Sequence, residues 1–110
     1  MSEKRVLLIE SGQFIGGVIH SLFERNDRLK VILASPTNSR ELLLAVKYHH
    51  PDIVVIDDTV SETYLEQLLR YMQKCADMRV VVVNTNSNRL SIYDKQQVDV
   101  TQTSDLFAIL

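Results

Sequence analysis

The sequence has no long hydrophobic run. The apolar stretches at 6–9, 53–56 and 80–83 contain four residues each, whereas a helix that spans a membrane needs about 20. The N-terminus, Met1–Arg5, leads straight into the first stretch without the extended apolar segment of a secretory signal. We therefore expect a cytoplasmic protein that has no membrane partner.

Cysteine and an excess of charge of one sign are also nearly absent. The single cysteine, Cys75, has no partner for an internal disulfide, and it falls among helically spaced apolar residues. This placement indicates a buried thiol in a reducing compartment. The net charge is −2 and the twelve basic residues are scattered along the chain, so no concentrated positive field attracts phosphate backbones. We expect no direct binding of nucleic acid.

The composition is that of one ordinary folded domain. The chain has 110 residues, of which 45% are apolar and 24% are charged. This length supports one hydrophobic core but not two. No repeat, linker or low-complexity tract divides the chain, and we interpret residues 1–110 as a single domain.

Short apolar runs alternate with helically spaced apolar residues along most of the chain. The runs that predict strands lie at 4–9, 31–34, 52–57, 79–83 and 97–101. Helical spacing predicts a first helix over 14–23 and a second that Asn38 caps and that stops before Pro51. A third helix follows, for which Ser61 is the expected cap.

The pattern is weaker beyond the fourth predicted strand. A polar loop at 84–88 is followed by Leu90, Ile92 and Tyr93, which predict at most one or two helical turns. The apolar residues at 106–110 predict a short final helix. The fourth helix is therefore expected to be short or missing.

Strands that alternate with helices indicate an α/β fold, because right-handed crossovers between parallel strands place helices on both faces of the sheet. We predict a flavodoxin-like, doubly wound sheet of five parallel strands in the order 2-1-3-4-5.

Candidate functional residues follow the predicted strands, since ligands of open α/β sheets bind beyond the carboxyl ends of the strands. Glu10 ends the first strand and Asp57 ends the third, and these strands are neighbours in the predicted order. Two carboxylates in one crevice suit Mg²⁺, which binds a few carboxylate oxygens and keeps several waters. An aspartate after a strand also commonly caps a turn, so the residues alone leave both interpretations open.

The stretch Pro51–Asp57, a proline and an aspartate followed by an apolar run and a second aspartate, resembles the receiver domains of two-component response regulators. The opening stretch, Lys4–Ile15, is similar to the family's first strand and helix start, and the resemblance covers nearly the whole chain. It implies that Asp57 is the phosphoacceptor. It also implies that Glu10, Asp57 and Thr59 hold Mg²⁺.

Other phosphoryl-transfer residues of the family are replaced. Ser11 stands where the family has its second metal-binding acid. Asn84, with Thr85 beside it, stands where the family's fourth strand ends in a threonine or serine that contacts the phosphoryl group. The resemblance therefore implies Asn84 and Thr85 as the candidate phosphoryl-contacting pair. The region that matches the family's lysine, Val100–Thr103, contains no lysine. The missing lysine and the missing metal-binding acid each remove positive charge that would stabilise the transferred phosphoryl group. Each loss is expected to slow phosphoryl transfer by roughly 10²-fold or more.

The resemblance therefore implies a degenerate receiver, or pseudo-receiver, of two-component or phosphorelay signalling. We expect a regulatory interaction module and not an enzyme, with a histidine kinase, an output domain or a second copy of the chain as its partner. Two alternatives stay open: a working receiver that takes phosphate on Asp57 from a histidine kinase with Mg²⁺, and a small-ligand-binding flavodoxin-like domain. The candidate contact surfaces are Tyr93, the segment around the fifth predicted strand and the last helix, unless they pack into the core.

Overall fold

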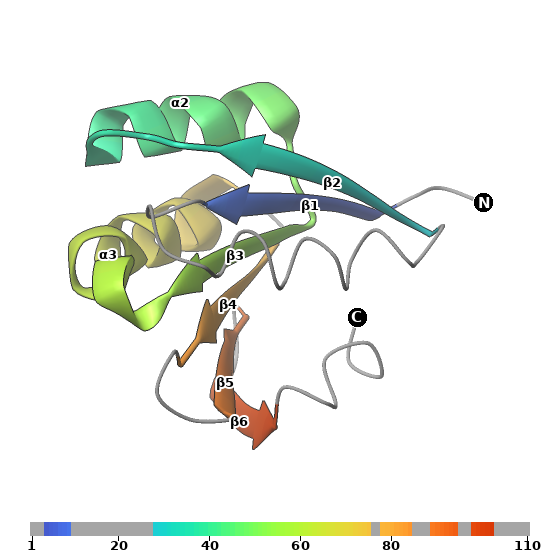
Figure 1. Cartoon of the computed structure of the whole chain (residues 1–110). Helices are drawn as coiled ribbons and strands as arrows, with labels where there is room; N and C mark the ends of the chain where they lie inside the picture. Colours follow the sequence, from blue (N-terminus) through green and yellow to red (C-terminus); the bar gives the residue numbers. More distant parts are fainter. Residues whose placement is uncertain (1–3, 10–27, 76–77, 85–88, 95–97, 103–110) are drawn as a thin grey trace.

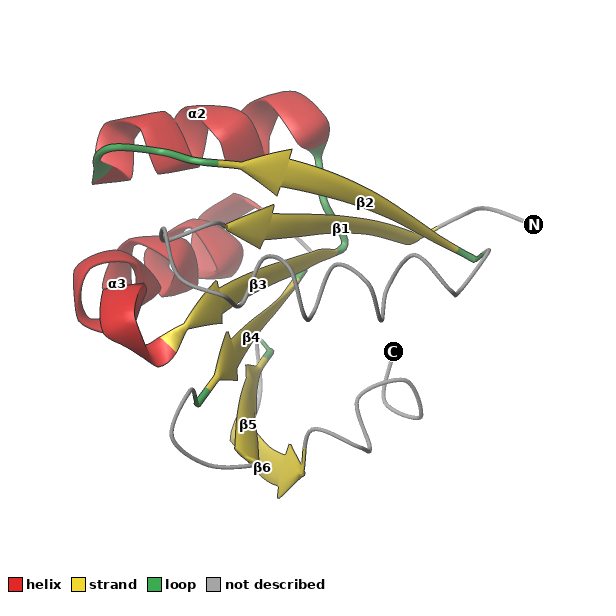
Figure 2. Ribbon diagram, in the orientation of Figure 1, coloured by secondary structure: helices red, strands yellow, loops and turns green. Residues whose placement is uncertain are grey.

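The protein folds as an α/β structure around one mixed sheet (Figures 1 and 2). The computed structural model describes residues 4–9, 28–75, 78–84, 89–94 and 98–102, with the backbone alone at 59–62, 75 and 98–102. The elements are β1 (Lys4–Ile9), β2 (Leu29–Ala34), α2 (Ser39–His49), β3 (Ile53–Asp57), α3 (Asp58–Cys75), β4 (Arg79–Val83), β5 (Arg89–Tyr93) and β6 (Val98–Gln102). The six strands lie in the order β2-β1-β3-β4-β5-β6.

The first four strands form the parallel part of the sheet. β1 pairs with both β2 and β3, and β3 pairs with β4, all in parallel. This arrangement confirms the predicted order 2-1-3-4. β1 and β3 are buried on both faces along most of their length, which explains why their sequences read as continuous apolar runs and do not alternate with polar residues.

The prediction of five parallel strands is wrong beyond β4. Residues 89–93, expected to form helical turns, form β5, which pairs antiparallel with β4. A parallel crossover needs a dozen or more residues, whereas the connection here is 84–88, long enough only for a hairpin. Residues 89–93 alternate between buried Leu90 and Ile92 and less buried neighbours, as a strand requires.

The expected fifth strand is also displaced. It forms β6, which pairs antiparallel with β5 and not with β4. β6 therefore runs in the same direction as β4 but lies one strand further out, about 10 Å from β4 at the usual strand spacing. The sheet is therefore mixed. Beyond β4, an antiparallel strand, β5, occupies the position next to β4 where a parallel strand was expected.

The hydrophobic core has two layers, one on each face of the sheet. One layer packs α2 and α3 against the sheet, and both helices lie on this face (Figure 1). Its central contacts come from Leu42 and Val46 of α2 and from Leu68 and Met72 of α3, all of which are buried. The other layer is equally buried and contains Val6, Leu8, Ile53, Val55, Val81, Val83, Leu90 and Ile92.

Helices on both faces were predicted, and α2 and α3 account for one face. The predicted helices at 14–23 and 106–110 lie outside the described residues. In the part of the chain that the structure describes, no helix is long and apolar enough to cross a membrane.

α2 begins at the predicted cap. The Asn38 side chain accepts a hydrogen bond from the backbone N–H of Glu41 at 2.9 Å. The Glu41 carboxylate in turn accepts bonds from the backbone N–H and the hydroxyl of Thr37, each at 2.9 Å. These two bonds, the backbone one first, hold the pKa of Glu41 below its usual value. The helix ends at His49, and His50 caps it in the left-handed conformation, with φ of 49°.

Candidate functional site

The predicted site lies at the carboxyl edge of the parallel strands, where Asp57 is the last residue of β3. Asp57 stands in register with Val83, the last residue of β4. Asn84 follows Val83 directly, so the structure places Asp57 and Asn84 at the ends of adjacent strands, as the sequence predicts. The two differ in exposure, because Asp57 is fully buried and Asn84 is exposed.

Burial sets Asp57 apart. Among the described residues it is the only polar or charged one that is buried, with 0% of its surface exposed. A buried carboxylate is costly unless hydrogen bonds satisfy it. No buried side-chain nitrogen or oxygen in the described part of the chain lacks a hydrogen-bond partner. The Asp57 carboxylate is therefore a satisfied group inside the fold.

The junction between β3 and α3 places Asp57 directly before a helix. α3 begins at Asp58, so helix follows strand without an intervening loop. The sequence placed the helix cap at Ser61, and this prediction is wrong because α3 starts three residues earlier. Asp57 occupies the position immediately before the helix, where aspartate is among the preferred N-cap residues. The structural alternative for Asp57, a cap for the following backbone, fits this geometry.

The predicted Mg²⁺ ligands are only partly described. Glu10 lies outside the described residues, as does Thr85 of the phosphoryl-contacting pair. Thr59 lies in the first turn of α3, and its backbone alone is described. The described residues contain no group of three acidic, histidine or cysteine side chains that could hold a metal ion. Mg²⁺ keeps several waters when bound, and a fully buried Asp57 does not fit such a hydrated ion.

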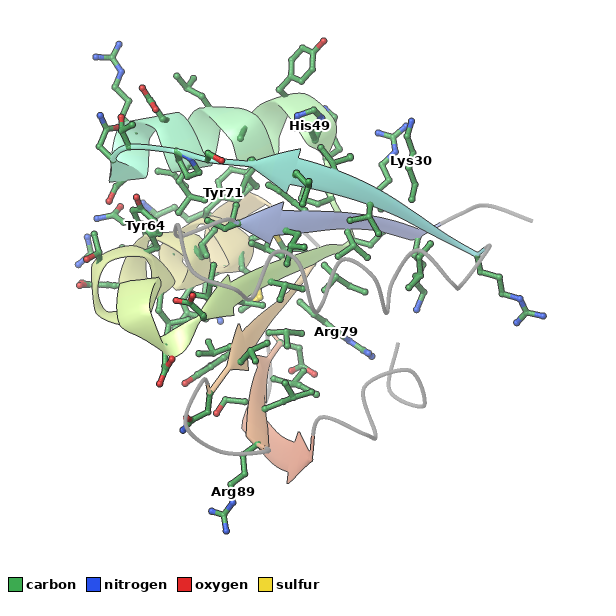
Figure 3. All side chains as sticks on the ribbon, viewed as in Figure 1. Lys30, His49, Tyr64, Tyr71, Arg79 and Arg89 are labelled. Atoms are coloured by element: carbon green, nitrogen blue, oxygen red, sulfur yellow. The ribbon has the colours of Figure 1, made fainter. Side chains whose placement is uncertain are left out.

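In the part of the chain that the structure describes, we find no cation in the place where receivers have one near the phosphoacceptor. Residues 100–102 of the region that matches the family's lysine lie in β6, which is three strands from β3. At the usual strand spacing this separation is about 14 Å, compared with about 10 Å in the predicted order. Arg89 starts β5 at the same edge, but it is exposed and points away from the sheet (Figure 3).

Tyr93, a predicted contact residue, is half-buried and packs against the core layer of α2 and α3. This position favours the alternative that it is a core residue. Two further contact surfaces were predicted. The fifth predicted strand forms β6, of which the backbone alone is described, and the final helix lies outside the described residues.

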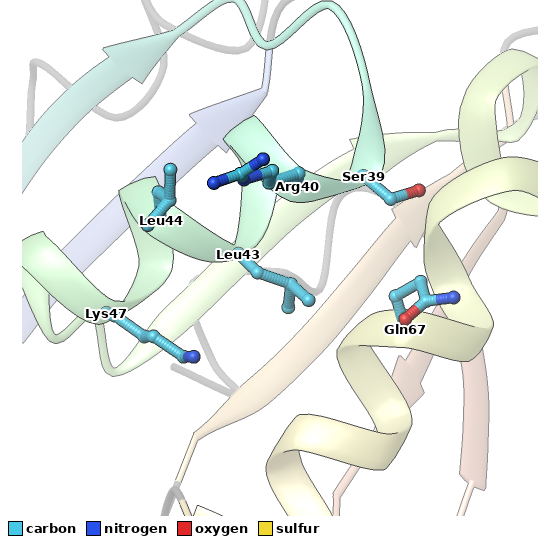
Figure 4. Close-up of a pocket in the computed structure, with 6 residues that line it drawn as sticks. All are labelled: Ser39, Arg40, Leu43, Leu44, Lys47 and Gln67. Carbon is cyan, nitrogen blue, oxygen red and sulfur yellow. The ribbon is translucent and has the colours of Figure 1, made fainter.

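Sequence reasoning missed a groove between α2 and α3. The α2–α3 groove has a volume of about 410 Å³ and is open to solvent (Figure 4). Its lining residues are Ser39, Arg40, Leu43, Leu44 and Lys47 of α2 and Gln67 of α3. A signal for it exists in the sequence, because Leu42, Leu43 and Leu44 are consecutive and a helix cannot turn three consecutive side chains toward one sheet.

Comparisons with known proteins identify no relative: no protein-family model, curated protein or solved structure matches the chain.

Proposed function

We propose that this chain is a receiver-like regulatory module that acts by binding a protein partner and not by accepting phosphate. The observation that carries the proposal is the position of Asp57. It lies where the resemblance puts the phosphoacceptor, yet it is fully buried and directly precedes α3. A phosphoacceptor must meet its phosphodonor and Mg²⁺, whereas a buried carboxylate at the start of a helix suits a role in the fold.

The arrangement of the sheet supports the same proposal. The parallel order 2-1-3-4 agrees with a flavodoxin-like, receiver-like core. The β4–β5 hairpin takes the place of a crossover in the chain order, so β6 and the region matching the family's lysine lie further from Asp57. The region that matches the family's lysine has no lysine to offset the charge that develops on the phosphoryl oxygens, and such a loss slows transfer. Binding is then the function that a receiver-like scaffold retains.

The test is direct phosphorylation of the full chain. It is incubated with acetyl phosphate and Mg²⁺, beside a conventional receiver that proves the reagents active, and its intact mass is measured. We expect no adduct, whereas phosphorylation would add about 80 Da as one phosphoryl group. A parallel incubation with beryllofluoride is expected to leave the backbone amide shifts of β3 and β4 unchanged.

Asp57→Asn is the matched variant, since it removes the nucleophile and keeps the shape of the side chain. An adduct on the natural chain that Asp57→Asn abolishes would overturn the proposal and establish the working receiver. An adduct that persists in Asp57→Asn lies elsewhere and leaves Asp57 as a residue of the fold.

A further inference from the structure

The α2–α3 groove carries positive charge that the described residues do not neutralise. Arg40 and Lys47 line it, and none of the described side chains that line it is a carboxylate. Among the described residues, the Arg40 guanidinium forms no ion pair or hydrogen bond. The Lys47 ammonium lies 5.9 Å from the centre of the Tyr71 ring, which holds it beside α3 without removing its charge.

The acidic side chains nearest in sequence are already engaged. Glu41, next to Arg40, accepts both of its hydrogen bonds from Thr37. Glu66, next to Gln67 of the groove, forms an ion pair with Arg70. The charges of Arg40 and Lys47 are therefore available to a ligand that binds in the groove.

The same surface is apolar between its two cations. Leu43 and Leu44 lie between Arg40 and Lys47 along α2 and line the groove (Figure 4). Leu44 is 56% exposed, and Tyr48, one turn further along, is 80% exposed. They are two of the three large hydrophobic side chains that the described chain exposes. Exposed apolar surface with polar residues around it is typical of binding sites.

The spacing of the two cations along α2 favours a helix as the ligand of the groove. Arg40 and Lys47 are seven residues apart, which is close to two helical turns, so they share one face of α2 about 10 Å apart. A helix lying along α2 repeats the same spacing. Its acidic residues at positions i and i+7 face the two cations, and its apolar residues at i+3 and i+4 face the leucines.

We propose that the α2–α3 groove binds an acidic amphipathic helix of a protein partner, with carboxylates seven residues apart on Arg40 and Lys47 and apolar side chains on Leu43 and Leu44. This inference rests on the proposed function, because it names the partner chemistry of a module that acts by binding. It places the contact on residues of α2 and α3 that include neither Asp57 nor Tyr93.

The probe is a fluorescein-labelled helical peptide of about 18 residues, long enough to form a helix. It carries glutamates at i and i+7 and leucines at i+3 and i+4. Fluorescence anisotropy with the full chain is expected to show saturable binding that weakens as salt is raised. Amide shifts on titration are expected in residues 39–48 and at Gln67. A second peptide, with lysine in place of each glutamate and the same leucines, is expected not to bind.

Matched variants locate the contact. Arg40→Glu is expected to weaken binding roughly fivefold, which corresponds to the upper end of the range for an exposed charge pair. Leu44→Ser is expected to weaken it as well. Arg89→Glu makes the same charge change on β5, where Arg89 points away from the sheet (Figure 3), and it is expected to leave binding unchanged.

Three results would overturn the inference: no saturable binding of the acidic peptide up to about 1 mM of chain, equal binding of the lysine peptide, or equal loss in Arg40→Glu and Arg89→Glu. Failure here is distinct from failure of the proposed function. A phosphoryl adduct on Asp57 overturns the latter whether or not the peptide binds, and an absent adduct with no peptide binding removes the groove alone.

Discussion

At the scale of single residues, Asp57 links the sequence pattern to the fold. Its carboxylate is fully buried, and it directly precedes α3. Removing one partner of a buried hydrogen bond leaves the other unsatisfied, at a cost of about 1–3 kcal/mol. We therefore expect Asp57→Ala to lower the free energy of urea unfolding by an amount in this range.

Asp57→Asn controls for shape, because it keeps one acceptor oxygen and the volume of the side chain. It is expected to lose less stability than Asp57→Ala. An Asp57→Ala variant more stable than the natural chain would contradict the structural role, since residues retained for activity are the ones whose removal commonly stabilises a protein.

Glu41 provides a pH-dependent contribution at the same scale. Its bonds from the backbone N–H and hydroxyl of Thr37 lower its pKa in the folded chain. A carboxyl group with a lowered folded pKa stabilises the fold above its unfolded pKa, and this contribution is lost as pH falls through the folded pKa. A ¹³C NMR titration of the Glu41 carboxyl is expected to show a midpoint below that of an ordinary glutamate.

Thr37→Ala removes the hydroxyl and leaves the backbone donor. We expect it to return the Glu41 midpoint part of the way toward the ordinary value. A midpoint that equals the ordinary value in the natural chain would show that the capping bonds are not formed in solution.

At the scale of elements, local sequence predicted what local interactions determine. The Asn38 cap of α2 and the apolar runs of β1 and β4 are encoded within a few residues, and the structure confirms each. β5 could not be recognised in the same way. Leu90, Ile92 and Tyr93 suit a helical turn as well as a strand, and their antiparallel partner on β4 decides between the two.

The sequence predicted some features of the candidate site and not others, for the same reason. The resemblance put Asp57 and Asn84 at neighbouring strand ends, and they lie there. Burial of Asp57 could not be foreseen, because it is a property of the packed fold and not of the local sequence. The local signal at Ser61 was also misleading, since α3 starts at Asp58. The groove depends on how α2 and α3 pack together, which no single segment encodes.

The β4–β5 hairpin is tested by its buried leucine. Leu90 is 0% exposed and packs with Val81 and Val83 in the core layer opposite α2 and α3. Leu90→Ala is expected to lower the free energy of unfolding by about 2–5 kcal/mol, as for other buried leucines. Leu44→Ala is the matched control, because Leu44 is 56% exposed; its effect is expected to stay within about 0.5 kcal/mol. Equal losses in the two variants would contradict the hairpin register.

At the scale of the whole molecule, one continuous sheet joins the described strands. β1 and β3 lie inside it, paired on both edges and buried on both faces, whereas β2 and β6 are its outer strands. Opening an inner strand requires disruption of both core layers, so its amides exchange only when the whole fold opens. We expect the slowest hydrogen exchange at Val54 and Val55 of β3.

The outer strands give the contrasting result. Among the described strands, β2 pairs only with β1, so none of them bonds to the backbone groups of its other edge. Exchange in β2 is therefore expected to alternate, with fast amides on the outer edge and slower ones toward β1. Uniformly slow exchange along Val31–Leu33 would mean that this edge is covered in solution, and repeating the measurement over a range of chain concentrations would identify a second copy as the cover.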